Sequence, residues 1–392
     1  MKPLILQSPT PGIWRYELEK LRLMTILGTR PEIIRLSEVI KCADRYFDHI
    51  LVHTGQNYDR TLNQVFFEEL GLREPDHYLD SVGEDLGQTM GNIIAKSYGL
   101  MNELKPDALL ILGDTNSALA AISAKRLKIP IFHMEAGNRC WDWNVSEMIN
   151  RKIVDHISDI NMPYTEHSRR YLLSEGIDGK TIFVTGSPMK EVMLKNRESI
   201  EASDVLERLS LKKDGYILVS AHREENIDIE ENFMALMNSI NHMAERYDMP
   251  VIYSTHPRSK KFIEKRGFQF DKRVRSLQPF GYFDYNKLQQ NAFVVLSDSG
   301  TLSEESAMLD FPAVLIRTST ERPEVLDKGS IVIGGIKERD VEQAAELARA
   351  MFDNKETFVE SPDYADENVS VKVIKLIQSY TKIVNETVWL KK

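Results

Sequence analysis

The chain has 392 residues, 42% of them hydrophobic and 28% charged, which is enough for two globular domains with separate cores. Its formal net charge of -9 at pH 7 argues against a general nucleic-acid-binding protein, which would need a basic face. Cys42 and Cys140 are the two cysteines; they form no disulfide framework and favour a reducing compartment. No apolar run is as long as a membrane span, and residues 1–20 lack the apolar segment of a signal peptide. We therefore expect a cytoplasmic protein with no membrane partner, and we interpret residues 1–20 as an extension before the fold.

Short apolar runs alternate with helical periodicity along the chain from Leu21 onward. We predict strands at residues 23–27, 50–52, 108–112, 131–134 and 182–184, and then at 216–219, 251–253, 293–296, 314–316 and 331–333. These runs are continuous rather than alternating, which is typical of parallel strands covered on both faces. Two such series in tandem predict an α/β protein with two doubly wound domains and a break near Ser187. An amphipathic pattern from Val369 to Ile377 predicts a closing helix.

Ligands of doubly wound folds bind beyond the carboxyl ends of the strands, so the residues that follow each strand are candidates for the site. Arg30 follows the first strand in a Gly-Thr-Arg-Pro turn, where free amides and a guanidinium could hold an anion. The same residues could also form a tight turn with a solvated arginine. Asp114 follows the third strand and could act in the site or cap the next helix.

The stretch from residue 131 to 151 carries two carboxylates, Glu135 and Glu147, and two arginines, Arg139 and Arg151. It also places tryptophans at positions 141 and 143 in a loop. Loops usually lack bulky apolar side chains, so we expect this loop to fold over a ligand.

In the second half, His222 follows a strand and suits proton transfer or phosphate contact. Ser299, Gly300 and Thr301 follow another strand and begin a helix, for which Thr301 and Glu304 predict a capping box. The hydroxyl and free amides at this helix N-terminus could bind a diphosphate, and Glu305 could accept both hydroxyls of a ribose. A plain capped helix would have a similar sequence. No G-x-G-x-x-G motif follows the first strand, which counts against a bound dinucleotide.

Taken together, these segments resemble the non-hydrolysing UDP-N-acetylglucosamine 2-epimerase family. The matching segments are GTRPEIIR (28–35), GDT (113–115), HMEAG (133–137), EMINR (147–151), HREEN (222–226), DSGTLSEE (298–305) and TERPE (320–324). No single segment is specific to this family, but the occurrence of all seven in the same order over nearly the whole chain is specific to it.

The resemblance implies a GT-B-type fold in which the last helix crosses back onto the first domain. The domains would then be 21–187 plus 367–392, and 188–366. It also implies a homodimeric enzyme that inverts C2 of a UDP-N-acetylhexosamine without NAD, metal or another cofactor. The family's reaction eliminates UDP to a 2-acetamidoglycal and adds it back, with the C2 proton delivered to the other face.

By position in these motifs, the resemblance makes Asp114, Glu135 and Glu147 the acid/base carboxylates and His222 an assisting histidine. The UDP and substrate contacts it implies, together with the neighbouring residues that we group with them, are Arg30, Arg35, Arg139, Arg151, Ser299, Gly300, Thr301, Glu305 and Arg322. We assign Arg322, in the TERPE segment, to phosphate binding.

Several departures from the family pattern concern the substrate. Arg35 stands where the family commonly has a lysine, Thr301 replaces a glycine, and Ser146 and Met148 flank Glu147. HMEAGNRC, with Arg35 and Thr301, resembles the branch that forms UDP-N-acetyl-L-fucosamine from UDP-2-acetamido-2,6-dideoxy-L-talose for capsule or O-antigen. The alternatives are a UDP-GlcNAc 2-epimerase, a GT-B glycosyltransferase, and an inactive UDP-sugar-binding protein. Gln56, Arg223 and His256 would belong to a second UDP-sugar site if one exists.

Overall fold

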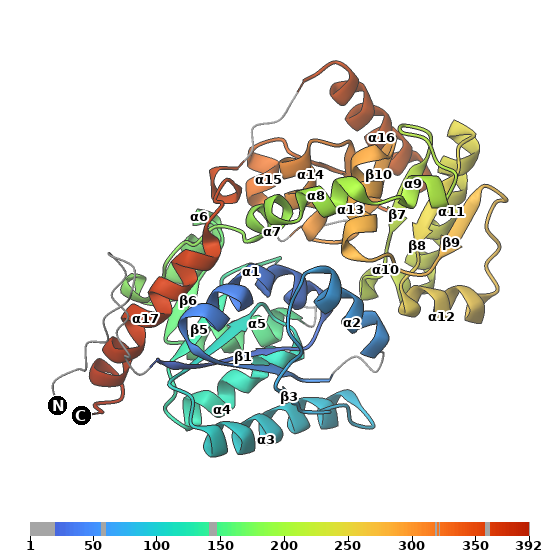
Figure 1. Cartoon of the computed structure of the whole chain (residues 1–392). Coiled ribbons are helices and arrows are strands. Elements are labelled where there is room, and N and C mark those ends of the chain that lie inside the picture. Colours follow the sequence, from blue (N-terminus) through green and yellow to red (C-terminus); the bar gives the residue numbers. More distant parts are fainter. Residues whose placement is uncertain are drawn as a thin grey trace, which may run out of the picture.

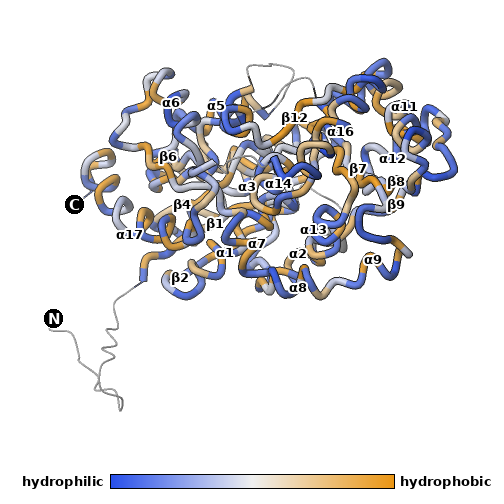
Figure 2. The backbone as a smooth tube through the Cα atoms, turned by 90° about the horizontal axis from the view of Figure 1, so that it is seen from above, coloured by the Kyte–Doolittle hydropathy of each residue, from blue (hydrophilic) through white to orange (hydrophobic). Residues whose placement is uncertain are grey.

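The computed structural model describes residues 20–55, 60–140, 147–317, 320, 322–356 and 361–391. Within them the chain forms two parallel sheets of six strands each, in separate halves of the molecule (Figure 1). Helices cover both faces of each sheet, and hydrophobic residues alternate with hydrophilic ones along covering helices such as α17 (Val369–Thr387) (Figure 2). The prediction of an α/β protein with two doubly wound domains is confirmed. No helix in the described ranges is long and apolar enough to cross a bilayer.

The first sheet has the strand order β3-β2-β1-β4-β5-β6. Its strands are β1 (Arg22–Leu27), β2 (Asp48–His53), β3 (His77–Tyr78), β4 (Ala108–Leu112), β5 (Ile131–Met134) and β6 (Ile160–Met162). In the parallel register, Leu27 lies beside His53 and Thr25 beside Leu110. The strand order reverses between β1 and β4, so the loops that leave these strands diverge and form a crevice for a ligand.

The helices of this half are α1 (Arg30–Tyr46), α2 (Arg60–Glu69), α3 (Leu86–Leu104), η1 (Asn116–Leu119), α4 (Ala120–Arg126), α5 (Glu147–Ile157), α6 (Glu166–Ser174) and η2 (Gly179–Thr181). Successive strand residues point to opposite faces, so Leu23 and Met24 enter different apolar cores. Pro31 stands in the first turn of α1, where its missing N–H costs no hydrogen bond.

The second sheet has the order β12-β11-β10-β7-β8-β9, with its reversal between β7 and β10. Its strands are β7 (Ile217–Ser220), β8 (Val251–Ser254), β9 (Val274–Leu277), β10 (Val294–Ser297), β11 (Ala313–Leu315) and β12 (Val332–Ile333). Its helices are α9 (Val205–Arg208), α10 (Glu224–Ile227), α11 (Glu230–Tyr247), α12 (Pro257–Arg266), α13 (Tyr282–Asn291), α14 (Thr301–Leu309), α15 (Pro323–Asp327), α16 (Glu338–Asp353) and η3 (Pro362–Tyr364).

The chain crosses between the halves at two adjacent places. Ser187 N donates a hydrogen bond to Asp363 O at 3.1 Å, which joins the outgoing and returning segments. Gly186 has φ +84°, and a Cβ there would lie 2.6 Å from Asp366 Oδ2, so the crossing requires glycine. After Ser187, α7 (Met189–Lys195) contacts both α1 and α14, and α8 (Arg197–Ala202) contacts α13.

The closing helix is confirmed: α17 returns to the first half and packs against α1 (Figure 1). Val373 and Ile377 are fully buried there, in the same core as Leu23. The limits assigned to the two domains stay a prediction.

Four details of the strands differ from the prediction. The strand predicted at 182–184 is wrong, because Ile182 makes only an isolated bridge with Asn161. The sequence does not predict β3, β6 or β9. β3 and β6 are two and three residues long, and β9 exposes Arg275 and Ser276 at a sheet edge, so none has a continuous apolar run.

Candidate active site

The carboxyl ends of the two sheets face each other, and two neighbouring cavities lie between them. One, the nucleotide cavity, is lined by Arg30, Ser220, Tyr285, Ser297 and Glu305 among others. The second, the carboxylate cavity, is lined by Asp114, Glu135, Glu147, Arg151 and Arg322 among others. Both cavities are lined by Arg35, His222, His256, Ser299 and Thr301, which makes them two parts of one cleft.

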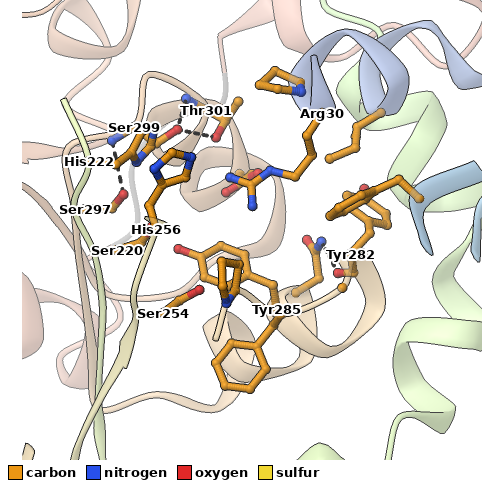
Figure 3. A pocket seen from close by; sticks show the side chains of 18 of the residues that line it. Arg30, Ser220, His222, Ser254, His256, Tyr282, Tyr285, Ser297, Ser299 and Thr301 are labelled. Carbon is orange, nitrogen blue, oxygen red and sulfur yellow. Dashed lines mark hydrogen bonds between the residues drawn. The ribbon is translucent and has the colours of Figure 1, made fainter. Parts of the chain in front are cut away.

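Arg30 enters the nucleotide cavity from the start of α1, opposite His222 and His256 (Figure 3). Its guanidinium lies 5.7 Å from the Phe66 ring centroid and makes no ion pair with a described residue. Burial lowers the pKa of Arg30 from its ordinary value, but an arginine remains charged at neutral pH. A half-buried cation with no ion pair among the described residues is suited to an anionic ligand.

His222 and His256 stack with ring centroids 5.2 Å apart. Burial lowers the pKa of His222 to about 3, and the positive charges of Arg30 and Arg223 add to that shift. Burial likewise lowers the pKa of His256 to about 3. Both imidazoles are therefore neutral at pH 7.

A buried aspartate, Asp298, fixes the turn that carries His222. Asp298 Oδ2 accepts hydrogen bonds from the backbone N–H groups of His222 and Arg223, each at 2.9 Å, and from Asn226 Nδ2 at 3.1 Å. Asp298 is fully buried, so it holds the turn rather than contacting a ligand.

The turn after β10 places Ser299, Gly300 and Thr301 on the cleft. Ser299 Oγ lies 2.8 Å from Thr301 Oγ1 and accepts a hydrogen bond from Thr301 N at 3.3 Å (Figure 3). The predicted capping box is wrong: Gly300 is the N-cap of α14 without a side-chain bond, and Glu304 instead faces two arginines. Glu305 lines the nucleotide cavity and accepts a hydrogen bond from Gln289 Nε2 at 2.6 Å. Burial raises the pKa of Glu305.

Glu135 stands at the end of β5 with φ +60°, a left-handed conformation that non-glycine residues rarely adopt. Its carboxylate contacts Arg35 at 2.5 Å and Arg322 at 2.9 Å. Burial alone would raise its pKa, but the guanidiniums of Arg35, Arg322 and Arg151 together lower the pKa of Glu135 to about 2. The carboxylate is therefore ionised, and it must leave part of this ion pairing before it can accept a proton.

Arg151, on α5, connects two residues of the predicted acid/base group, Asp114 and Glu135. It donates short hydrogen bonds to the Asp114 carboxylate and to the backbone oxygen of Glu135. Asn150 Nδ2 also donates to Asp114 O, at 3.0 Å. Glu147 begins the same helix and lines the carboxylate cavity. The three predicted carboxylates therefore share one cavity, and Asp114 does not serve as a helix cap, since Thr115 is the N-cap of η1.

Two predicted ligand contacts are placed differently by the structure. Arg139 is buried away from both cavities, where it pairs with Asp155 at 2.8 Å and with Glu175 at 2.6 Å. The prediction that it binds substrate is wrong, because two carboxylates already neutralise it inside the first half. Arg322 does line the carboxylate cavity, but its guanidinium contacts Glu135 and Glu304.

Glu32 is a further carboxyl group that lines the carboxylate cavity, as Glu224 and Glu225 also do, and the sequence analysis assigns it no role. It is 1% exposed, and burial raises its pKa to about 7. The sequence does contain one signal for a role of Glu32 in the site: it directly follows Arg30 and Pro31, in the segment that turns at the carboxyl end of β1.

Some predictions fall outside the described residues: those on Trp141, Trp143 and Ser146, on Gln56, and on residues 1–19. Among the residues that the structure does describe, no group of three or more His, Cys, Asp or Glu side chains could hold a metal ion.

The fold and this cleft correspond to a known family. The family UDP-N-acetylglucosamine 2-epimerase matches residues 41–378. A UDP-N-acetylglucosamine 2-epimerase from Methanocaldococcus jannaschii is 34% identical over 336 residues, which cover 83% of this chain and 92% of that protein. A UDP-2,3-diacetamido-2,3-dideoxy-D-glucuronate 2-epimerase from Pseudomonas aeruginosa is 33% identical over 330 residues, covering 83% of this chain and 91% of that protein.

Two solved structures are similar over nearly the whole chain. The UDP-N-acetylglucosamine 2-epimerase from Rickettsia bellii superposes with a TM-score of 0.87 at 45% identity, covering 95% of this chain and all of that one. The Methanocaldococcus jannaschii UDP-GlcNAc 2-epimerase in complex with UDP-GlcNAc and UDP superposes with a TM-score of 0.85 at 32% identity, covering 92% and 100%. The protein is thus a two-domain α/β isomerase of GT-B type. It belongs to the UDP-N-acetylglucosamine 2-epimerase family.

Proposed function

We propose that this protein inverts C2 of a UDP-N-acetylhexosamine by eliminating UDP and adding it back to the 2-acetamidoglycal. The observation that carries the proposal is the joined cleft. One of its cavities is lined by the predicted acid/base residues Asp114, Glu135 and Glu147. The other is lined by Arg30, which makes no ion pair with a described residue, and by residues at the start of α14. The first is suited to removing and returning a proton, and the second to holding a nucleoside diphosphate.

The chemistry assigns a task to each cavity. In elimination, the C2 proton moves to a carboxylate of the group Asp114, Glu135 and Glu147, while the electrons of the C1–O bond leave with UDP. Return of UDP to C1 and of a proton to the opposite face of C2 gives the epimer. Arg30, Ser299, Gly300 and the neutral His222 would bind the diphosphate, and negative charge on the leaving group would be stabilised there.

For the sugar itself, we propose UDP-2-acetamido-2,6-dideoxy-L-talose as substrate and UDP-N-acetyl-L-fucosamine as product. This rests on the segment from His133 to Cys140 together with Arg35 and Thr301, and it would place the protein in capsule or O-antigen synthesis. UDP-GlcNAc is the second candidate, since several relatives are UDP-GlcNAc 2-epimerases. A relative of nearly equal identity is named for a third sugar, UDP-2,3-diacetamido-2,3-dideoxy-D-glucuronate, so membership of the family does not by itself fix the sugar.

Exchange of the C2 proton in D2O tests the reaction and the sugar together. Incubation with each UDP-sugar, followed by NMR, should show deuteration at C2 and an epimer of the proposed L-sugar. If UDP-GlcNAc were deuterated and the L-sugar were not, UDP-GlcNAc would be the substrate and the proposal of the L-sugar would be wrong.

Variants of the carboxylates test the proposed residues. Asp114→Asn and Glu135→Gln should each lower kcat by about 10²–10⁴-fold, the usual contribution of a positioned acid or base. Both should keep UDP binding, because the nucleotide cavity is intact. Transfer of the sugar to an acceptor without exchange at C2 would instead indicate a glycosyltransferase.

A further inference from the structure

Four buried side chains from the two halves form a closed ring beside the carboxylate cavity. Arg35 contacts Glu135 at 2.5 Å and Glu304 at 3.1 Å. Arg322 contacts the same two carboxylates, Glu135 at 2.9 Å and Glu304 at 2.6 Å. Both guanidiniums also lie 5.8 Å from the centroid of the Tyr164 ring. Two cations and two anions alternate around the ring, so it carries no net charge.

The two carboxylates of this ring differ in their access to a ligand. Glu135 lines the carboxylate cavity, whereas Glu304 is 0% exposed and lines neither cavity. The second oxygen of Glu304 accepts a short hydrogen bond from Ser187 Oγ, at the place where the chain crosses between the halves. Glu304 therefore joins the ring to that crossing and cannot itself touch the substrate.

The charge balance of the ring changes if Glu135 accepts a proton. The ring then gains one positive charge, and Glu304 is the remaining carboxylate of the ring that contacts both Arg35 and Arg322. Without it, neither carboxylate of the ring would compensate the two buried guanidiniums, and Glu324 attracts Arg322 from outside the ring. Repulsion between the guanidiniums would then be strongly unfavourable. With Glu304, they stay in place and their excess charge lies next to the nucleotide cavity, which Arg35 also lines.

We propose that Glu304 is a positioning residue that acts on Glu135 through Arg35 and Arg322. It stays in contact with both guanidiniums while the C2 proton moves to a Glu135 oxygen and the C1–O electrons leave with UDP. It also ties both guanidiniums to the crossing at Ser187, so their placement follows that of the two halves. This inference rests on the proposed epimerase function and on Glu135 as the proton acceptor.

The test compares Glu304→Gln and Glu304→Asp with the wild type. The glutamine variant leaves Glu135 as the one carboxylate of the ring that contacts both guanidiniums, so they bind it more strongly and make it a weaker base. We expect kcat to fall on the order of tenfold to a hundredfold, as for loss of a group that orients a catalytic side chain. KM and the Kd for UDP should stay within about twofold, and the isotope effect with C2-deuterated substrate should increase. Glu304→Asp keeps the charge and should recover much of kcat.

Glu191→Gln is the matched control, because Glu191 is also a buried carboxylate between segments of the two crossings. It accepts hydrogen bonds from Ser370 N at 2.8 Å and Ser370 Oγ at 2.6 Å and does not contact the ring. It should lower the unfolding temperature without changing the isotope effect. The inference is overturned if Glu304→Gln keeps kcat and the isotope effect, or if Kd for UDP weakens in step with kcat. No C2 exchange by the wild type would instead overturn the proposed function.

Discussion

Glu32 and Thr115 join the two loops that diverge at the centre of the first sheet: Thr115 Oγ1 donates a hydrogen bond to Glu32 Oε1 at 3.1 Å. The other oxygen of Glu32 accepts hydrogen bonds from Gly28 N at 3.1 Å and Thr29 Oγ1 at 2.7 Å. One buried carboxyl group thus fastens the loop after β1 to the loop that carries Asp114. The first loop leads to Arg30 in the nucleotide cavity and the second carries Asp114 in the carboxylate cavity, so the ionisation of Glu32 bears on both cavities.

The stability of the protein should depend on pH through Glu32. Burial raises the pKa of this carboxyl from 4.5 to about 7, so the folded state keeps its proton where the unfolded chain has lost it. The stabilisation is therefore fully present below about pH 4.5 and is lost as the pH rises towards 7. Relative to wild type, Glu32→Gln should gain about 3 kcal/mol of unfolding free energy between pH 4 and pH 8. Urea unfolding at both pH values measures this, and a difference that does not change with pH would contradict the raised pKa.

Binding of UDP should be coupled to proton uptake. Burial and the surrounding arginines lower the pKa values of His222 and His256 to about 3 in the free protein. A bound diphosphate supplies negative charge beside them and should raise both pKa values towards the ordinary 6.5. Calorimetry in buffers of different ionisation enthalpy should show uptake that grows as the pH falls from about 7 to about 5.

The surface residue His242 provides the control for this prediction. His222→Gln should lower the uptake, whereas His242→Gln should not, because His242 pairs with Glu342 on the outside of the second half. Equal uptake in both variants would assign the proton to another group.

Arg30 should be a main determinant of nucleotide affinity. Its guanidinium faces the cleft without an ion pair among the described residues, so a diphosphate would add direct anionic contacts to the longer-range attraction of Glu305. Arg30→Met should weaken UDP binding by about 1.5–3 kcal/mol, the usual value for hydrogen bonds to a charged group. Arg45→Met, at the exposed end of the same helix, is the matched control and should bind UDP like wild type. Isothermal titration of both variants checks this, and equal affinities would remove Arg30 from the site.

The sequence was sufficient to predict two parallel sheets with nine of the twelve described strands, and the position of most cleft residues. Buried parallel strands are continuous apolar runs, and the residues after such strands meet at one edge, as Asp114 and Glu135 do. It could not show which charges pair across the cleft, since Arg35 and Glu304 are 269 positions apart. Glu304 follows Thr301 by three residues, so the sequence suggested a capping box. Arg139 was predicted to contact the ligand because it lies in the same stretch as Glu135 and Glu147. The sequence could not show that it pairs instead with Asp155 and Glu175.

The contribution of α17 to the core of the first half can be measured by a pair of isoleucine variants on that helix. Ile377 is fully buried in the cluster that contains Leu23, so Ile377→Ala should lower the unfolding free energy by about 2–5 kcal/mol. Ile383 is 45% exposed, so Ile383→Ala should cost less than about 1 kcal/mol. Hydrogen exchange adds the location: in Ile377→Ala the amides of β1 should lose more protection than those of β7, which packs in a separate core. If β7 lost as much protection as β1, or if both variants were equally stable, α17 could not be counted as part of the first domain.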